Sequence, residues 1–140
     1  MGFRMDFKAE KLLSVFLWLV SLHSLLVGIG LIFLPSSAFE FLGFEPTFDR
    51  FFSTQGGVFH IAMAVCYSMA ASDLIKYKQL IIFSIIVKFI ATVFLLSYYL
   101  LISSQWMIIF SCVTDFIVGL LLLYLYHRLI KESYFDHCYL

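Results

Sequence analysis

Long apolar stretches alternate with short polar ones along the whole chain. Four of them approach or exceed the roughly 20 residues needed to cross a bilayer, and they run from Leu12 to Leu34, Phe51 to Ser72, Leu80 to Ile102 and Met107 to Ile130. The chain is 63% hydrophobic and only 13% charged, which is more apolar than a soluble domain of 140 residues can bury. The sequence therefore predicts an all-α integral membrane protein, a four-helix bundle in which residues 1–140 form a single domain.

The longest connection, from Pro35 to Thr54, predicts a short helix between the first two crossings. Ser37 and Glu40 have the spacing of a capping box, and Gly43 is placed to end that helix. The segment also carries too many phenylalanines for so short a piece to bury. We therefore expect it to lie at the outer membrane interface.

Positive charges predict the orientation of the bundle. Four crossings place both termini and the connection after the second segment on one side, which carries seven of the nine basic residues: Arg4, Lys8, Lys11, Lys76, Lys78, Arg128 and Lys131. The opposite side carries only Arg50, and Lys88 lies inside the third segment. The positive-inside rule then predicts cytoplasmic termini. Because the formal net charge is zero and there is no basic patch, a nucleic-acid partner is not expected.

Two of the connections are short, and they predict which helices are neighbours. Residues 73–79 and 103–106 leave so little chain that the second segment should pack antiparallel to the third, and the third antiparallel to the fourth.

Three ionisable residues, His60, Lys88 and Asp115, lie deep inside the last three apolar segments. A lone charge at the bilayer centre costs about 2.5 to 3.5 kcal/mol on insertion scales, so we expect Lys88 and Asp115 to pair across neighbouring helices. At about 1.5 Å per residue, His60 and Asp115 lie at the same depth. The pair is either structural, fixing the register of the bundle, or part of a site that also serves a ligand or a proton.

Each of the last three segments has one semi-polar face that includes one of these residues. The faces follow helical spacing and should meet inside the bundle, because small and polar residues in membranes pack against other helices. They consist of Gly56, Gly57, His60, Ala64, Ser68 and Ala71; of Ser84, Lys88, Ala91 and Thr92; and of Ser111, Asp115 and Gly119.

The candidate site residues follow from these faces. His60 and Asp115 are the candidates for acid/base catalysis, although a buried histidine bonded to a serine or a carbonyl is the simpler alternative. Lys88, His60 and Asp115 could line a ligand pocket, and Arg50 with Gln55 could contact a lipid head group at the outer surface.

A metal site is not expected, since it would need three or four converging ligands. A b-type haem would need facing histidines at one depth, and His23 and His60 differ by about one turn.

Several short sequences resemble small bacterial membrane proteins of the DoxX-like kind. They are "GIGLIFLP" at the end of the first segment, Arg50 followed by "QGG" at the start of the second, the "AA" at Ala70 and Ala71, and "DFIVG" in the fourth. The resemblance implies a four-helix fold in a bacterial inner membrane, and it brings quinone into consideration, because members have been linked with quinone-associated redox complexes.

We expect a non-enzymatic role. The first hypothesis is a protein that binds a lipid or quinone between its semi-polar faces, or an accessory subunit of a larger membrane complex. The alternative is a small membrane enzyme in which His60 and Asp115 exchange protons while Lys88 stabilises negative charge. A transporter would require a homo-oligomer, because the chain shows no inverted repeat. Membrane lipids are the expected surroundings in every case.

Overall fold

The computed structural model describes residues 9–44 and 50–135, and this part of the chain contains helices and no strand. The helices are α1 (Ala9–Phe33), α2 (Ser36–Phe41), α3 (Arg50–Ser72), α4 (Lys78–Leu101) and α5 (Trp106–Lys131). The four long helices coincide with the four predicted segments to within a few residues, and α2 is the predicted short helix. The all-α prediction is therefore confirmed.

Three of the long helices have the length and hydropathy of membrane spans: α1, α4 and α5. In the described chain α3 does not reach this hydropathy, although it is 23 residues long. The difference lies in composition, because α3 contains serine, threonine, glutamine, glycine and histidine where the other three are almost continuously apolar. The structure thus supports an integral membrane protein with three clear spans, one fewer than the sequence pattern predicts.

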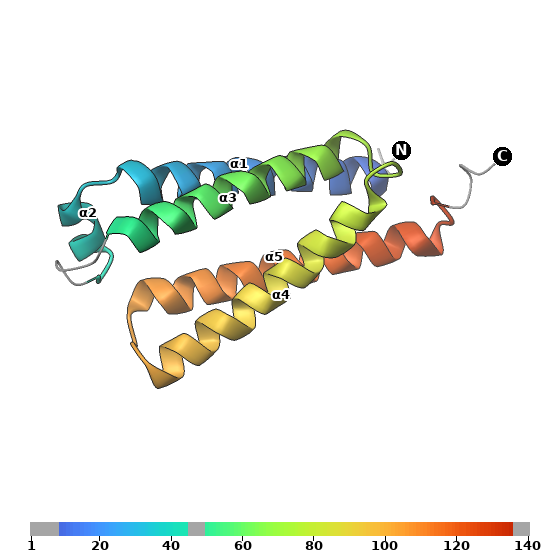
Figure 1. The fold of residues 1–140 in the computed structure, drawn as a ribbon. Helices are drawn as coiled ribbons and strands as arrows, with labels where there is room; N and C mark the ends of the chain where they lie inside the picture. Colours follow the sequence, from blue (N-terminus) through green and yellow to red (C-terminus); the bar gives the residue numbers. More distant parts are fainter. Residues whose placement is uncertain (1–8, 45–49, 136–140) are drawn as a thin grey trace, which may run out of the picture.

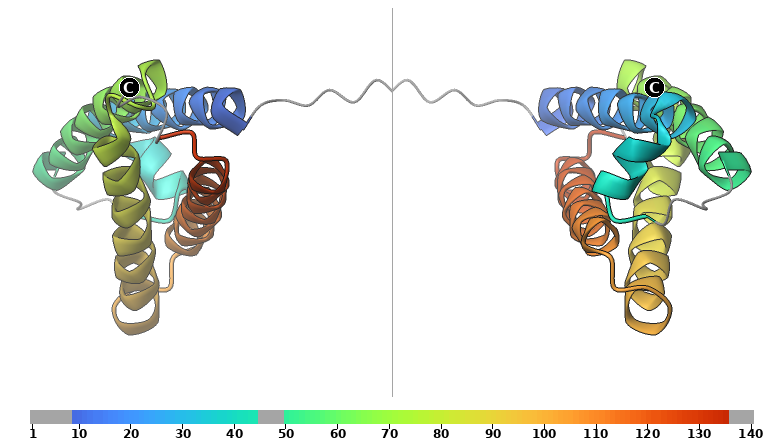
Figure 2. Two further views of the ribbon diagram at one scale, coloured as in Figure 1. Left: turned by 90° about the vertical axis from the view of Figure 1, so that its right-hand side faces the viewer. Right: turned by 90° about the vertical axis from the view of Figure 1, so that its left-hand side faces the viewer.

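The long helices form two antiparallel pairs that spread apart from one end (Figure 1). One pair is α1 with α3, and the other is α4 with α5. The pairs meet at the end that carries the turn between α3 and α4, and they diverge toward the end that carries α2. The end-on views show the same separation between the pairs (Figure 2). The predicted antiparallel neighbours α4 and α5 pack along their length, whereas α3 and α4 are neighbours mainly near their turn.

Serine hydroxyls on α1 join it to the backbone of α3. Ser14 donates a hydrogen bond to the Ala71 carbonyl at 2.8 Å, and Ser21 donates to the Ala64 carbonyl at 2.7 Å. The two serines are seven residues apart, and so are the two alanines that accept from them. The two helices therefore keep one register over several turns. Bonds of this kind between small residues are typical of helix packing in lipid, where apolar surface gains nothing by leaving its solvent.

The closest approach of α1 and α3 continues this register at Gly28 and Gly57. An added Cβ on Gly57 would lie 2.7 Å from the Gly28 carbonyl oxygen and 2.6 Å from Ile32 Cγ1. A Cβ on Gly28 would in turn lie 2.8 Å from the Gly57 carbonyl oxygen. Only glycine fits at either position, which confirms that the small-residue face of α3 packs against another helix and identifies that helix as α1.

The apolar core lies in the half of the molecule where the two pairs meet. Leu13 and Leu17 of α1, Ile81 of α4 and Leu122 of α5 are completely buried there, and Tyr67 is 1% exposed. This half is sealed by large side chains from all four long helices. The other half of the molecule lies between Lys88 and the end that carries α2. Among the described residues it has no comparable core.

The segment around α2 differs in detail from its prediction. Helix α2 has Pro35 at its N-cap, with no side-chain cap, and Ser37 lies inside the helix. The predicted capping box is therefore wrong, because the helix begins at Ser36, two residues before the start that a Ser37 cap requires. Gly43 does follow the end of the helix as predicted, with a φ of +93° that favours glycine, and it approaches Trp106 at the start of α5.

The two neighbouring glycines of α3 should respond to alanine with opposite signs. We expect Gly57→Ala to destabilise the protein by about 1 to 3 kcal/mol, because the new methyl group collides with the backbone of α1. Gly56→Ala is the matched control, since its Cβ would find its nearest neighbour at 3.8 Å and alanine favours the helix. Unfolding free energies in mixed micelles measure both. Equal effects of the two substitutions would contradict the close approach.

Candidate functional site

The predicted ion pair between Lys88 and Asp115 is confirmed. Lys88 Nζ of α4 lies 2.5 Å from Asp115 Oδ1 of α5, and Lys88 is only 7% exposed. Gly119, one turn beyond Asp115, gives the lysine its room, because a Cβ there would lie 3.3 Å from Lys88 Cβ. The lysine stem therefore lies across a glycine and directs its amine toward the carboxylate.

Neighbouring groups fix the position of Lys88. The Tyr67 ring of α3 lies 5.8 Å from Lys88 Nζ, within range of a cation–π interaction. Thr92 Oγ1 donates to the Lys88 carbonyl at 2.8 Å, and Cys112 of α5 lies 3.5 Å from the Thr92 carbonyl. The pair thus contacts α3 as well as α4 and α5, at the outer limit of the apolar core.

The pair is not sealed inside that core. It lines a cavity of about 290 Å³, and the Asp115 side chain is 19% exposed against 9% for that of Lys88. The other walls come from α1, α3 and α4, with Ser24, Phe59, His60, Met63, Tyr67, Val87, Ala91, Phe94 and Leu95. A ligand in this cavity would meet a lysine amine, a carboxylate and an imidazole on walls that are otherwise apolar apart from Ser24 and Tyr67.

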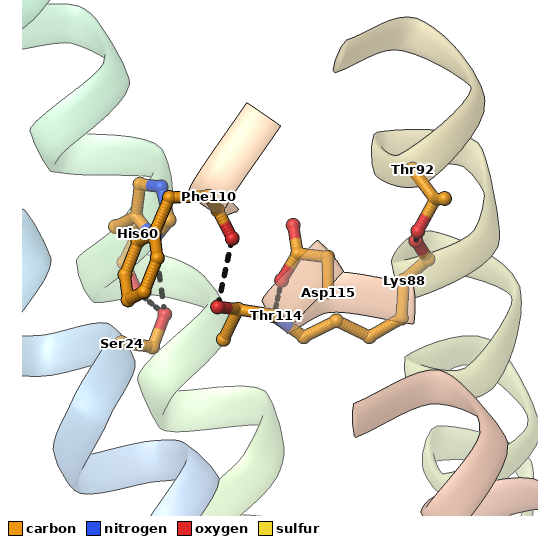
Figure 3. Close-up of polar contacts among 7 residues, drawn as sticks. All are labelled: Ser24, His60, Lys88, Thr92, Phe110, Thr114 and Asp115. Carbon is orange, nitrogen blue, oxygen red and sulfur yellow. Dashed lines mark hydrogen bonds and ion pairs between the residues drawn. The ribbon is translucent and has the colours of Figure 1, made fainter. Parts of the chain in front are cut away.

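His60 bonds to Ser24 (Figure 3). Ser24 Oγ donates to the His60 carbonyl at 2.9 Å and lies 3.3 Å from His60 Nδ1. Because the hydroxyl has one hydrogen and gives it to the carbonyl, we assign the ring hydrogen to Nδ1, which leaves Nε2 as an acceptor in the neutral ring. Within the described chain no hydrogen bond or ion pair joins His60 to Asp115. The ring nitrogen of His60 has a serine as its partner, which is the simpler of the two alternatives that the sequence left open.

The cavity brings together three of the five candidate ligand-binding residues: Lys88, His60 and Asp115. Arg50 lies elsewhere, where its guanidinium donates to the carbonyls of Ile32 and Leu34 at 3.1 and 3.2 Å and so caps the end of α1. Gln55 is exposed on α3 and does not line the cavity. His23, weighed above as a haem ligand, is exposed on α1.

Two residues of the site were not predicted from the sequence. Ser24 lies on the face of α1 that also carries Ser21 and Gly28. These two small residues are seven positions apart, which is also the spacing of Gly57, Ala64 and Ala71 on α3. Comparing the two patterns would have predicted the pairing of α1 with α3. Tyr67 lies two turns from His60 on the same helix and therefore on the same face, which is the only sequence signal for it.

Removing one charge of the buried pair should cost more than removing both. We expect Lys88→Met and Asp115→Leu each to lower the unfolding free energy by about 3 to 5 kcal/mol, since each leaves a buried charge alone. The double variant should lose less than either single one. Unfolding in mixed micelles gives the free energies of the wild-type protein, the two single variants and the double variant, which together form a double-mutant cycle. Additive losses would show that the two residues do not stabilise each other.

Within residues 9–44 and 50–135 no group of three or more histidine, cysteine, aspartate or glutamate side chains is placed to hold a metal ion. Comparison of the whole chain with protein-family models, with curated proteins and with solved structures gave no match.

Proposed function

We propose that this chain is a polytopic membrane protein that binds a lipid-soluble molecule in the cavity beside Lys88 and Asp115. Its four long helices would all cross the bilayer, in the DoxX-like arrangement that the sequence resembles. That resemblance also supports a bacterial cell membrane and a role as an accessory subunit of a larger complex. Lipid and quinone are the ligands that the sequence brought into consideration, and the cavity suits a molecule with a polar group on an apolar frame.

The exposure of the ion pair to the cavity carries the proposal. A pair that only fixed the register would need no open space beside it. The Asp115 side chain is 19% exposed, and it lines a cavity whose walls are largely apolar. Cavities between bundle helices with a few polar groups on apolar walls are the usual form of small-molecule sites.

A fourth crossing by α3 is supported by its packing and its surface. Helix α3 runs antiparallel beside α1, which is itself a clear span, and the two are bonded over several turns. Helix α3 exposes large apolar side chains that line neither cavity: Phe51, Phe52, Val58, Val65 and Met69. Such a surface suits lipid better than water.

Four crossings place the ends of the chain and the turn after α3 on the same face of the membrane. We expect single cysteines at Lys76 and Ser133 to react with an impermeant thiol reagent only from the cytoplasm, and one at Ser104 only from outside. The background is a Cys66→Ser, Cys112→Ser, Cys138→Ser chain. In both topologies the Lys11 end of α1 lies in the cytoplasm. If α3 does not cross, the cysteines at Lys76 and Ser133 therefore react from outside, and the one at Ser104 reacts from the cytoplasm.

Ligand binding should be lost with the polar pair. We expect native mass spectrometry of protein released from nanodiscs of bacterial polar lipids to show a discrete retained adduct. The Lys88→Met, Asp115→Leu double variant should lose most of it, since this variant removes the polar groups without leaving a lone charge. The matched control is Arg128→Gln with Glu132→Gln, which removes an exposed ion pair of α5 outside the cavity.

The proposal is wrong if the purified protein keeps no adduct, or if the double variant and the wild-type protein keep the same one. In either case the ion pair is structural. An adduct lost equally in the control pair would indicate general lipid retention by the α5 surface rather than binding in the cavity.

A further inference from the structure

The cavity at the ion pair adjoins a second cavity on its outer side. The outer cavity has a volume of about 460 Å³ and shares Phe94 and Leu95 with the inner cavity. Its walls come from Phe44 after α2, from the outer part of α4 and from the beginning of α5, with Tyr98, Ser103, Gln105, Met107, Ile108 and Ser111. The two cavities thus adjoin on α4, where Lys88, Ala91, Leu95 and Tyr98 follow one another on one face.

The two cavities have different chemistry. The inner one holds the charged pair and the imidazole, whereas the outer one has apolar walls with a few neutral polar groups. Lys88 and Tyr98 are ten residues apart, which corresponds to about 15 Å along the helix. The combined space therefore suits an elongated molecule with one polar end at Lys88 and an apolar body of about that length.

The charges of the inner cavity determine which polar end it accepts. Lys88 and Asp115 neutralise each other, so a ligand carboxylate would meet the Asp115 charge and a ligand ammonium would meet that of Lys88. Either ligand would leave a net charge in surroundings of low dielectric, which is costly. A neutral ligand leaves the balance unchanged.

The hydrogen-bonding groups favour a hydroxyl in particular. Asp115 takes one of the three N–H donors of Lys88, so the amine keeps donor capacity, and the carboxylate keeps acceptor capacity. With the ring hydrogen assigned to Nδ1, His60 of the same cavity wall adds an acceptor at Nε2. A hydroxyl group both donates and accepts one bond, so it could accept from Lys88 while donating to Asp115 or His60.

We propose that the ligand is a long-chain lipid alcohol, seated with its hydroxyl against Lys88, Asp115 and His60 and with its apolar chain directed outward between α4 and α5. This rests on the proposed ligand-binding function and adds the class and the orientation of the ligand. The outer cavity then holds the chain, and Phe44 lies over its far end.

Three photoreactive probes test both the class and the orientation. They share one dodecyl chain with a diazirine at its end and differ in the head, which is a hydroxyl, a carboxylate or a trimethylammonium group. Each is added at the same mole fraction to nanodiscs that contain the protein at pH 8, and labelled peptides are mapped after irradiation. We expect the alcohol to label residues 94–111 at least about tenfold more than either charged probe, in a manner that unlabelled dodecanol displaces.

Two tryptophan substitutions on α5 locate the chain. Ser111→Trp fills the outer cavity and should abolish the displaceable labelling by the alcohol. Ile117→Trp is the matched control, because Ile117 is 49% exposed and does not line either cavity. Thermal unfolding of both variants confirms that they fold, and the comparison of the three heads on the wild-type protein needs neither variant.

The outcomes separate this inference from the proposed function. Equal or stronger displaceable labelling by the carboxylate or the ammonium probe overturns the neutral head, and alcohol labelling centred on the α3 side of the inner cavity overturns the orientation. If no probe gives displaceable labelling while the wild-type protein retains its own adduct in native mass spectrometry, the alcohol is wrong and ligand binding stands. If that adduct is also absent, both proposals fail.

Discussion

A charged side chain inside a membrane must find an opposite charge, and in this protein that requirement joins α4 to α5 at Lys88 and Asp115. The contact depends on Gly119, which lets the lysine stem cross the surface of α5. It also marks a boundary within the bundle. On one side of it large apolar residues from all four long helices fill the interior, and on the other side the helix pairs spread apart and leave the two cavities.

The spreading follows from the different ways in which the two pairs are held. Helices α1 and α3 approach closely along their length, because serine hydroxyls bond to carbonyls and two glycines face each other. Helices α4 and α5 are connected by the ion pair, by Cys112 at the Thr92 carbonyl and by side-chain packing around them. Lipid offers no hydrophobic drive to close the space between the pairs. They are joined mainly by the core at one end, so at the other end the pairs stay apart, and the residues after α2, Gly43 and Phe44, lie near α5 and the outer cavity.

Hydropathy and helical spacing were enough to predict the four long helices, α2 and the Lys88 to Asp115 contact, because each depends on local sequence or on one large energy. Helix neighbours were harder. The short turn predicted that α3 and α4 are neighbours, which holds mainly near the turn, whereas the glycine and serine register makes α1 the main partner of α3. Arg50 could not be assigned from sequence either, since its partners are the carbonyls of Ile32 and Leu34, which become available only where α1 ends.

The placement of the pair has a physical consequence for what the cavity can contain. Two charges gain little net stability from being buried together, and apolar residues of similar size often serve as well. Lys88 has three N–H donors, of which Asp115 accepts one, and the Tyr67 ring faces the amine at 5.8 Å. The remaining hydrogen-bonding capacity faces a largely apolar cavity. Within a bilayer only trapped water or the polar end of a ligand can satisfy it, and a ligand whose chain also fills the outer cavity would bury apolar surface that water cannot.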